Sequence, residues 1–289
     1  MINQDSTRKF IFEQADIRGE VVHLDTAYAE ITAIHQYAPS VSRLLGEFLA
    51  AAVLLSTTIK FEGRLILQAQ SQGEIPLLMA ECRHDLQIRA IARGAEQATA
   101  TEFSDLLRDG QLAITIEPDD GRRYQGIVPL TGDSLATAIE HYFENSEQLA
   151  TRLWLASDGT RAAGLLLQQL PAQVTEDAAE RSERWVHTCI LADTIKGSEI
   201  LESEQEELLY RLFHQDPLRI FTSESVRFAC SCSRERSHDA LLALGQQELR
   251  SLLEEAEPIC IDCEFCNQQY LFTRQDLLVE IETPPSALH

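Results

Sequence analysis

Apolar residues recur with two different periods in the first part of the chain, which predicts a mixture of strands and helices. Arg64–Gln70 and Leu112–Ile116 carry apolar residues over strand length. The turn signal Asp119–Gly121 follows, and Tyr124–Leu130 is predicted to be the return strand of a hairpin. Val41–Ile59 is apolar nearly all round, which predicts a buried helix.

Three further segments extend this pattern. Thr101–Arg108 is typical of a short helix, with Thr101 as its N-cap and Gly110 near its C-terminal end. Ser134–Glu144 is predicted to be another helix, and Gly164–Leu170 a strand that closes the region. We therefore expect the first domain to mix helices and strands.

The composition changes after residue 173. Val174–Glu207 has ten acidic residues against three basic ones and contains no proline. Its apolar positions are spaced for one face of broken helices: Trp185, Val186, Ile190, Leu191, Ile195, Ile200, Leu201, Leu208 and Leu209. Isolated helices of this length are weak in water, so this acidic amphipathic segment needs a neighbour to cover its apolar face.

The last part of the chain is a small cysteine-rich unit. Ser237–Leu244 is predicted to be a helix with Ser237 as its N-cap, and Gln247–Glu255 a second helix. Ile259–Ile261 and Tyr270–Phe272 are predicted to be the two strands of a hairpin.

These patterns predict an α+β protein in three parts: a large N-terminal domain (1–173), a helical acidic linker (174–225) and a small cysteine-rich domain (226–289). The 289 residues are enough to bury a sizeable core. The net charge of -22 would repel phosphates and anionic lipids, which argues against nucleic-acid or membrane partners. We see no targeting signal, and the apolar run Phe48–Leu55 is short for a membrane span, so a cytoplasmic location is expected.

Five of the seven cysteines lie within 37 consecutive residues, which indicates a site. Cys230 and Cys232 form one close pair, and Cys263 and Cys266 form another thirty residues later. Two such pairs are typical of a four-thiolate zinc site, which predicts one Zn²⁺ per chain. Asn267 follows the second pair, where a zinc knuckle needs a residue that tolerates positive φ.

Cys260 leaves a second register open, because Cys260 and Cys263 are also separated by two residues. We prefer Cys263 with Cys266, since Asn267 suits the knuckle turn and Cys260 lies on an alternating strand. His238 is another conceivable ligand, but we expect it to be exposed near the start of a helix.

The four thiolates also suggest a switch. A zinc ion supplies about 10–16 kcal/mol of folding energy to a small unit with few large apolar residues. Metal-bound thiolates are the form that oxidants attack, and each close pair can then close on itself in a loop too short to tie distant segments together. The alternative is a permanently reduced structural zinc site, and the spacing alone does not decide between the two.

Several motifs connect this chain with a known family. The strongest are FACSCSRER and CEFCNQQYLF, at Phe228–Arg236 and Cys263–Phe272, and the others lie at Leu44–Leu55, Gln125–Leu130, Ser146–Ala156, Gly164–Pro171 and Glu207–His214. With these motifs in this order, the sequence resembles the redox-regulated heat-shock protein 33 family of holdase chaperones over nearly its whole length.

The resemblance implies an ATP-independent chaperone of the oxidative stress response. Cys230, Cys232, Cys263 and Cys266 would hold zinc in the reduced, inactive protein. Oxidation would form the disulfides Cys230–Cys232 and Cys263–Cys266, release zinc, unfold the linker and expose apolar surface to unfolding client proteins. The oxidised protein would form a homodimer. Cys260 is not part of the family motif, so a Cys260–Cys263 disulfide stays open.

Two other classes of function compete with the chaperone. A nucleic-acid-binding zinc module needs a basic surface, but residues 226–289 contain five arginines, no lysine and a larger number of acidic residues. A zinc hydrolase needs an open coordination position, which four cysteines close. A thiol oxidoreductase would combine one C-x-x-C pair with a thioredoxin-like βαβ pattern, which we do not find. We therefore expect no enzymatic activity.

Overall fold

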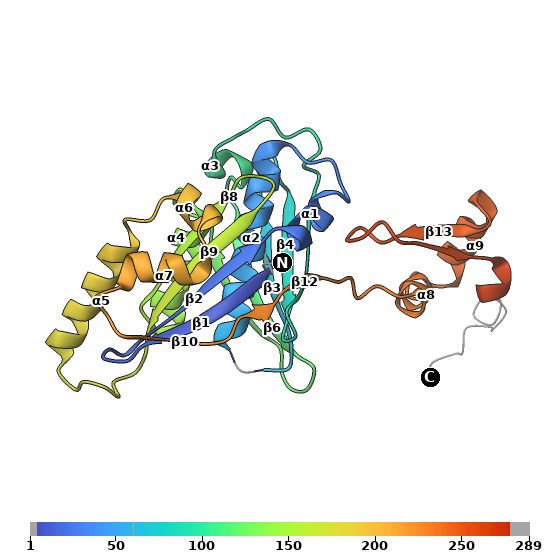
Figure 1. The fold of residues 1–289 in the computed structure, drawn as a ribbon. Coiled ribbons are helices and arrows are strands. Elements are labelled where there is room, and N and C mark those ends of the chain that lie inside the picture. Colours follow the sequence, from blue (N-terminus) through green and yellow to red (C-terminus); the bar gives the residue numbers. More distant parts are fainter. Residues whose placement is uncertain (1–4, 60, 278–289) are drawn as a thin grey trace. The chain divides into compact units, whose positions relative to one another are not determined.

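A computed structural model describes residues 5–59 and 61–277. The chain divides into two compact units, Met1–Ala229 and Cys230–His289. In the first unit, strands and helices surround the long helix α2, and the second contains two helices and a hairpin (Figure 1). The α+β class is thus confirmed, whereas the predicted boundaries after residues 173 and 225 stay predictions.

One antiparallel sheet of the first unit contains the N-terminal hairpin at its centre. Its order is β10-β1-β2-β9-β8, and β11 also pairs with β1. The strands are β1 (Ser6–Phe12), β2 (Ile17–Leu24), β8 (Thr151–Ser157), β9 (Ala162–Gln169), β10 (Leu218–Ile220) and β11 (Glu224–Ser225). We call it sheet A. The predicted strand Gly164–Leu170 is confirmed as β9.

The second sheet, sheet B, has the order β12-β5-β4-β3-β6-β7. Its strands are β3 (Gly63–Gln70), β4 (Leu77–Arg83), β5 (Gln87–Arg93), β6 (Gln111–Pro118), β7 (Tyr124–Pro129) and β12 (Arg227–Phe228). All its pairs are antiparallel except that of β12 with β5. The predicted hairpin around Asp119–Gly121 is confirmed as β6 and β7.

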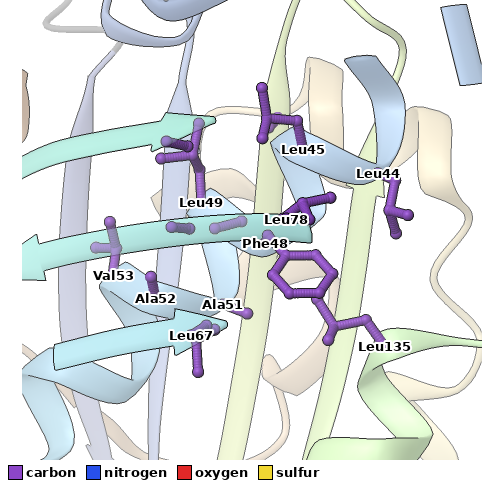
Figure 2. Packing of buried hydrophobic residues seen from close by; sticks show 14 of the residues in the cluster. Leu44, Leu45, Phe48, Leu49, Ala51, Ala52, Val53, Leu67, Leu78 and Leu135 are labelled. Carbon is purple, nitrogen blue, oxygen red and sulfur yellow. The ribbon is translucent and has the colours of Figure 1, made fainter. Parts of the chain in front are cut away.

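Helix α2 (Pro39–Thr58) forms the centre of the main core, as its apolar composition predicts. Its side chains gather with Leu67 of β3, Leu78 of β4 and Leu135 in one buried cluster (Figure 2). The helix is long and apolar enough to span a membrane, and it is longer than the apolar run Phe48–Leu55 alone suggests. However, 72% of its most apolar window is buried inside the protein. We therefore interpret it as a core helix.

Three shorter helices and a π-helical turn complete this part: α1 (Thr26–Thr32), α3 (Phe103–Leu106), α4 (Leu135–Tyr142) and η1 (Phe143–Glu147). Ser134 caps α4 by accepting the N–H of Thr137. The prediction for α3 was wrong in its length and cap. The hydroxyl of Thr101 bonds to the side chain of Glu102 instead of capping the helix.

The acidic segment folds into the expected broken helices, α5 (Ala178–Ala192), α6 (Gly197–Glu202) and α7 (Gln205–Phe213). Their buried apolar residues share a cluster with Phe10, Val21 and Leu165 of sheet A. Neighbouring strand residues such as Val22 and Leu166 belong instead to the α2 cluster, because successive side chains of a strand point to opposite faces. Sheet A thus covers most of the apolar face of the linker helices, but the prediction was wrong for Val186 and Ile190, which are exposed on α5.

The second unit comprises α8 (Arg234–Leu242), α9 (Gln246–Glu255), β13 (Ile259–Asp262) and β14 (Gln269–Phe272). The two predicted strands are confirmed, and they pair antiparallel. The cap of α8 was predicted wrongly, because Ser233 and not Ser237 accepts the N–H of Arg236. The core that its described residues form is small, with six buried apolar side chains: Leu241, Leu249, Leu253, Ile259, Phe272 and Leu277.

Candidate metal centre

The four predicted cysteines meet in the second unit. Their sulfur atoms all lie within 4.8 Å of one another. The Cys230 and Cys263 sulfurs are 3.6 Å apart, and the Cys232 and Cys266 sulfurs 3.4 Å apart. A tetrahedron with zinc–sulfur bonds of about 2.3 Å has sulfur–sulfur edges of roughly 3.8 Å. The four side chains therefore fit a tetrahedral metal ion.

A tight turn between β13 and β14 positions the second pair. The N–H groups of Cys266 and Asn267 donate to the carbonyl of Cys263, at 3.2 and 2.7 Å, and the N–H of Cys263 donates to the carbonyl of Gln268 at 2.9 Å. Asn267 has a φ of 54°, as the sequence predicts for this position. The turn closes the chain so that both sulfurs face the first pair.

The first pair lies in the segment that leads into α8. Ser233 caps this helix directly after Cys232, which fixes the direction in which the chain leaves the pair. The guanidinium of Arg236 donates to the backbone carbonyl of Ser231 at 2.8 Å, between the two cysteines. The local sequence thus holds the extended segment with Cys230 and Cys232 against the turn that carries Cys263 and Cys266.

Hydrogen bonds and burial act in opposite directions on the thiols of the cluster. Burial opposes ionisation of Cys232, but the hydroxyl of Tyr270 donates to its sulfur at 3.2 Å and, with the neighbouring thiols, lowers its pKa overall. Burial raises the pKa of Cys263 and Cys266, against the backbone bonds from Phe265 and Gln268. A divalent cation would favour thiolates at all four positions.

Tyr270 is the site residue that the sequence interpretation missed, because it was assigned only to a strand. The sequence contained a signal for this role. Tyr270 belongs to the motif CEFCNQQYLF and lies at the end of β14 that is next to the turn after Cys266. In an antiparallel hairpin, residues close to the turn lie near the groups that the turn presents.

The other candidate ligands lie apart from the four sulfurs. Cys260 is exposed on β13, and its thiol contacts Asp262 at 3.7 Å. His238 packs against the ring of Phe272, with its Nε2 3.3 Å from the carbonyl oxygen of Asp276. Cys82 and Cys189 are buried in the first unit, and burial raises the pKa of each thiol to about 12.

Comparison with known proteins identifies the family. The family model described as Hsp33 protein matches residues 5–273. This chain belongs to the Hsp33 family. It is 48% identical to the 33 kDa chaperonin of Pseudomonas paraeruginosa over 280 residues, 96% of this chain and 94% of that protein. The 33 kDa chaperonin of Azotobacter vinelandii is 50% identical, with the same shares covered.

A solved structure has the same fold. The crystal structure of the 33 kDa chaperonin (heat shock protein 33 homolog) of Thermotoga maritima matches with a TM-score of 0.81 and 20% identity. The match covers 96% of this chain and 98% of that chain. The Hsp33 relatives are named chaperonins and are not enzymes, so this chain is a chaperone of that family whose four clustered cysteines could hold a metal ion.

Proposed function

We propose that this Hsp33 family member is a redox-regulated, ATP-independent holdase of the cytoplasm that binds unfolding proteins under oxidative stress. One observation carries the proposal: two cysteine pairs, each close in sequence, come from segments thirty residues apart and meet in one cluster. In the reduced, inactive protein, Cys230, Cys232, Cys263 and Cys266 hold one Zn²⁺ per chain.

The size of the second unit explains why the metal would control its fold. Only six apolar side chains are buried in its described core, too few to stabilise a unit of this size easily. Bound zinc supplies folding energy of about 10–16 kcal/mol by holding the two cysteine segments together. When that connection is lost, the unit is expected to unfold.

We propose that oxidation breaks the connection that zinc makes between the two cysteine segments. In each pair, two thiolates give two electrons to hydrogen peroxide. One disulfide bond forms, the O–O bond breaks, and with two protons the peroxide becomes two waters. The products are the disulfides Cys230–Cys232 and Cys263–Cys266, which close very short loops and connect nothing distant. The long-range connection is therefore not restored.

The linker is the second part of the switch. Asp193 of the linker accepts hydrogen bonds from Arg152 at 2.9 Å and from the indole of Trp154 at 3.1 Å, both on β8. Gln205 donates to the backbone carbonyl of Ser6 on β1. We propose that the linker leaves sheet A after oxidation, and that the uncovered apolar faces bind clients and support a homodimer.

The deciding experiment adds peroxide at mildly elevated temperature and follows zinc release together with light scattering from an unfolding client. Protection of the client that appears as zinc is released supports the switch. Full protection by the reduced, zinc-loaded protein would overturn it. The variant Cys260→Ser, which is expected to keep its zinc, is treated in the same way and controls for oxidation at this exposed thiol outside the cluster.

A further inference from the structure

A cavity of about 330 Å³ opens between the two sheets of the first unit, and none of its described lining residues is a cysteine or belongs to the linker. Its inner wall is apolar, with the buried residues Leu55 of α2, Leu65 of β3 and Ile114 of β6. Phe143 and Leu149 continue this wall. Cavities of about this size and apolar character are the smallest that commonly bind organic ligands.

One cation faces this apolar space. Arg18 of β2 lines the cavity and is half-buried. Its Nε and Nη2 donate to the amide oxygen of Gln168, and Nη2 also donates to the carbonyl of Thr58 at 3.1 Å. The side chain of Gln168 is held in turn by Thr151 and is 1% exposed. Buried neutral groups therefore fix the guanidinium in place.

Arg18 makes no salt bridge with a carboxylate in the described part of the chain, although the charge of Glu20 on the same strand attracts it. The nearest acid along β2, Glu20, is buried and accepts hydrogen bonds from Thr7 and Thr57. No ion pair joins Glu20 to Arg18, and Nη1 of Arg18 has no hydrogen-bond partner among the described residues. A fixed, partly desolvated guanidinium with a free N–H edge is a good partner for a carboxylate.

The rim of the cavity is polar and carries a negatively charged side chain. Tyr124 and Glu147 are exposed there, and Glu147 accepts hydrogen bonds from the hydroxyls of Tyr142 at 2.9 Å and Tyr124 at 3.3 Å. The Tyr142 ring reaches this position because β7 has Gly126 beneath it, where a Cβ atom would lie 2.3 Å from the ring. An anionic group is thus disfavoured beside Glu147 and favoured beside Arg18.

We propose that this cavity binds a small amphipathic carboxylate of the fatty-acid type, with its alkyl chain between Leu65, Ile114 and Phe143 and its carboxylate on Arg18. The ligand binds the folded first unit, so it raises the thermal stability of that unit. This site goes beyond the proposed chaperone function and requires neither the metal nor oxidation of the cysteines.

The test uses the reduced, zinc-loaded full chain and three probes of equal chain length: decanoate, decanol and decylamine, below their micelle concentrations. Calorimetric titration is expected to show saturable decanoate binding with one site per chain and a raised unfolding temperature. Decanol should bind at least tenfold more weakly, because it has no negative charge to accept charge-assisted hydrogen bonds from Arg18. Stronger binding of decylamine or equal binding of decanol would overturn the proposal.

Variants locate the site. Arg18→Gln is expected to weaken decanoate binding about tenfold or more while leaving decanol unchanged. Leu149→Trp fills the cavity from an irregular segment and should weaken both ligands. Arg108→Gln, an exposed arginine that does not line this cavity, is the matched control. Decanoate affinity that survives both Arg18→Gln and Leu149→Trp would show that it binds elsewhere, and absence of saturable binding to the unmodified protein would overturn the site.

Discussion

Cys260 and Cys266 differ at the scale of single residues, although both are cysteines of the same short segment. The exposed thiol of Cys260 points to Asp262, whereas the Cys266 sulfur lies 3.4 Å from that of Cys232. We expect Cys260→Ser to keep one zinc per chain and Cys266→Ser to lose it. Zinc released by a thiol reagent and measured with a metal-binding dye checks this. Equal loss in both variants would mean that the ligand register is wrong.

Glu20 is a buried carboxylate whose protonation depends on the fold. Burial raises its pKa from 4.5 to about 7, although bonds from Thr57 and Thr7 lower it in part. The folded state then favours the protonated form, so its contribution to stability is complete below pH 4.5 and is lost as the pH rises to about 7. The loss amounts to at most about 3 kcal/mol.

The variant Glu20→Gln removes this titration. Its stability relative to the unmodified protein is expected to increase as the pH rises through that window, in urea unfolding followed by circular dichroism. Glu30→Gln, an exposed position on α1, is the control. A constant difference between Glu20→Gln and the unmodified protein from pH 4.5 to 7 would contradict the assignment.

The elements show which parts of the fold a sequence pattern can predict. Helix α2 was predictable because its apolar residues continue all round for twenty residues, and β6 and β7 because a turn signal joins them. The strands β1 and β2 were not predicted. They mix charged and apolar residues, and β2 pairs with β9, whose residues come about 145 positions later. Such pairing depends on tertiary contacts that no local window contains.

The sequence was equally limited in predicting which residue caps helix α8. Ser233 and Ser237 are both good N-cap residues, and the helical pattern after them fits either start. The structure begins α8 at Arg234, directly behind Cys232. The helical pattern alone therefore did not decide between the two caps. The four sulfurs, by contrast, were predictable because the spacing within each cysteine pair is a local property of the sequence.

At the scale of the elements, the contact that Asp193 of the linker makes with β8 can be tested. Asp193→Ala removes the bonds from Arg152 and Trp154, so docking of the linker on sheet A should weaken by about 1 kcal/mol, a value kept low because the groups are partly exposed. Trp154 makes this contact itself, and Trp185 of α5 packs against the same apolar cluster, so intrinsic fluorescence during heating of the reduced protein reports its loss.

The transition of Asp193→Ala is expected at lower temperature than that of the unmodified protein. Glu183→Ala is the control, because Glu183 is exposed on α5, the helix that Asp193 caps at its C-terminal end, and has no hydrogen bond or ion pair in the described structure. If both variants melt alike, Asp193 does not contribute to docking.

For the whole molecule, the two units differ in what stabilises them. The first unit contains the large cluster around α2, which requires no metal, whereas the second has only a small apolar core and four sulfurs. The sequence predicted the site and the low apolar content of the second unit. It did not predict how the first unit buries its core, because that core lies between two sheets whose strands come from distant parts of the chain. Oxidation should therefore unfold the second unit while the α2 core stays folded.

The pairing of the disulfides decides whether oxidation can have that effect. All four sulfurs lie within 4.8 Å of one another, so proximity in the folded cluster does not select partners. Cross pairs such as Cys230–Cys263 would keep the two segments connected, whereas local pairs would release them. We expect local pairs, because a neighbour two or three residues away stays close after the segments separate.

Trypsin distinguishes the two cases, because it cleaves after Arg227, Arg234, Arg250 and Arg274. Cys230 and Cys232 then lie in the peptide 228–234, and the other three cysteines of the region in the peptide 251–274. Mass spectrometry of the oxidised protein should find these as separate peptides, each lighter by two hydrogen atoms. One joined peptide would show cross pairing, and the long-range connection would then survive oxidation. Cys260→Ser should leave the result unchanged, because Cys263 pairs with Cys266.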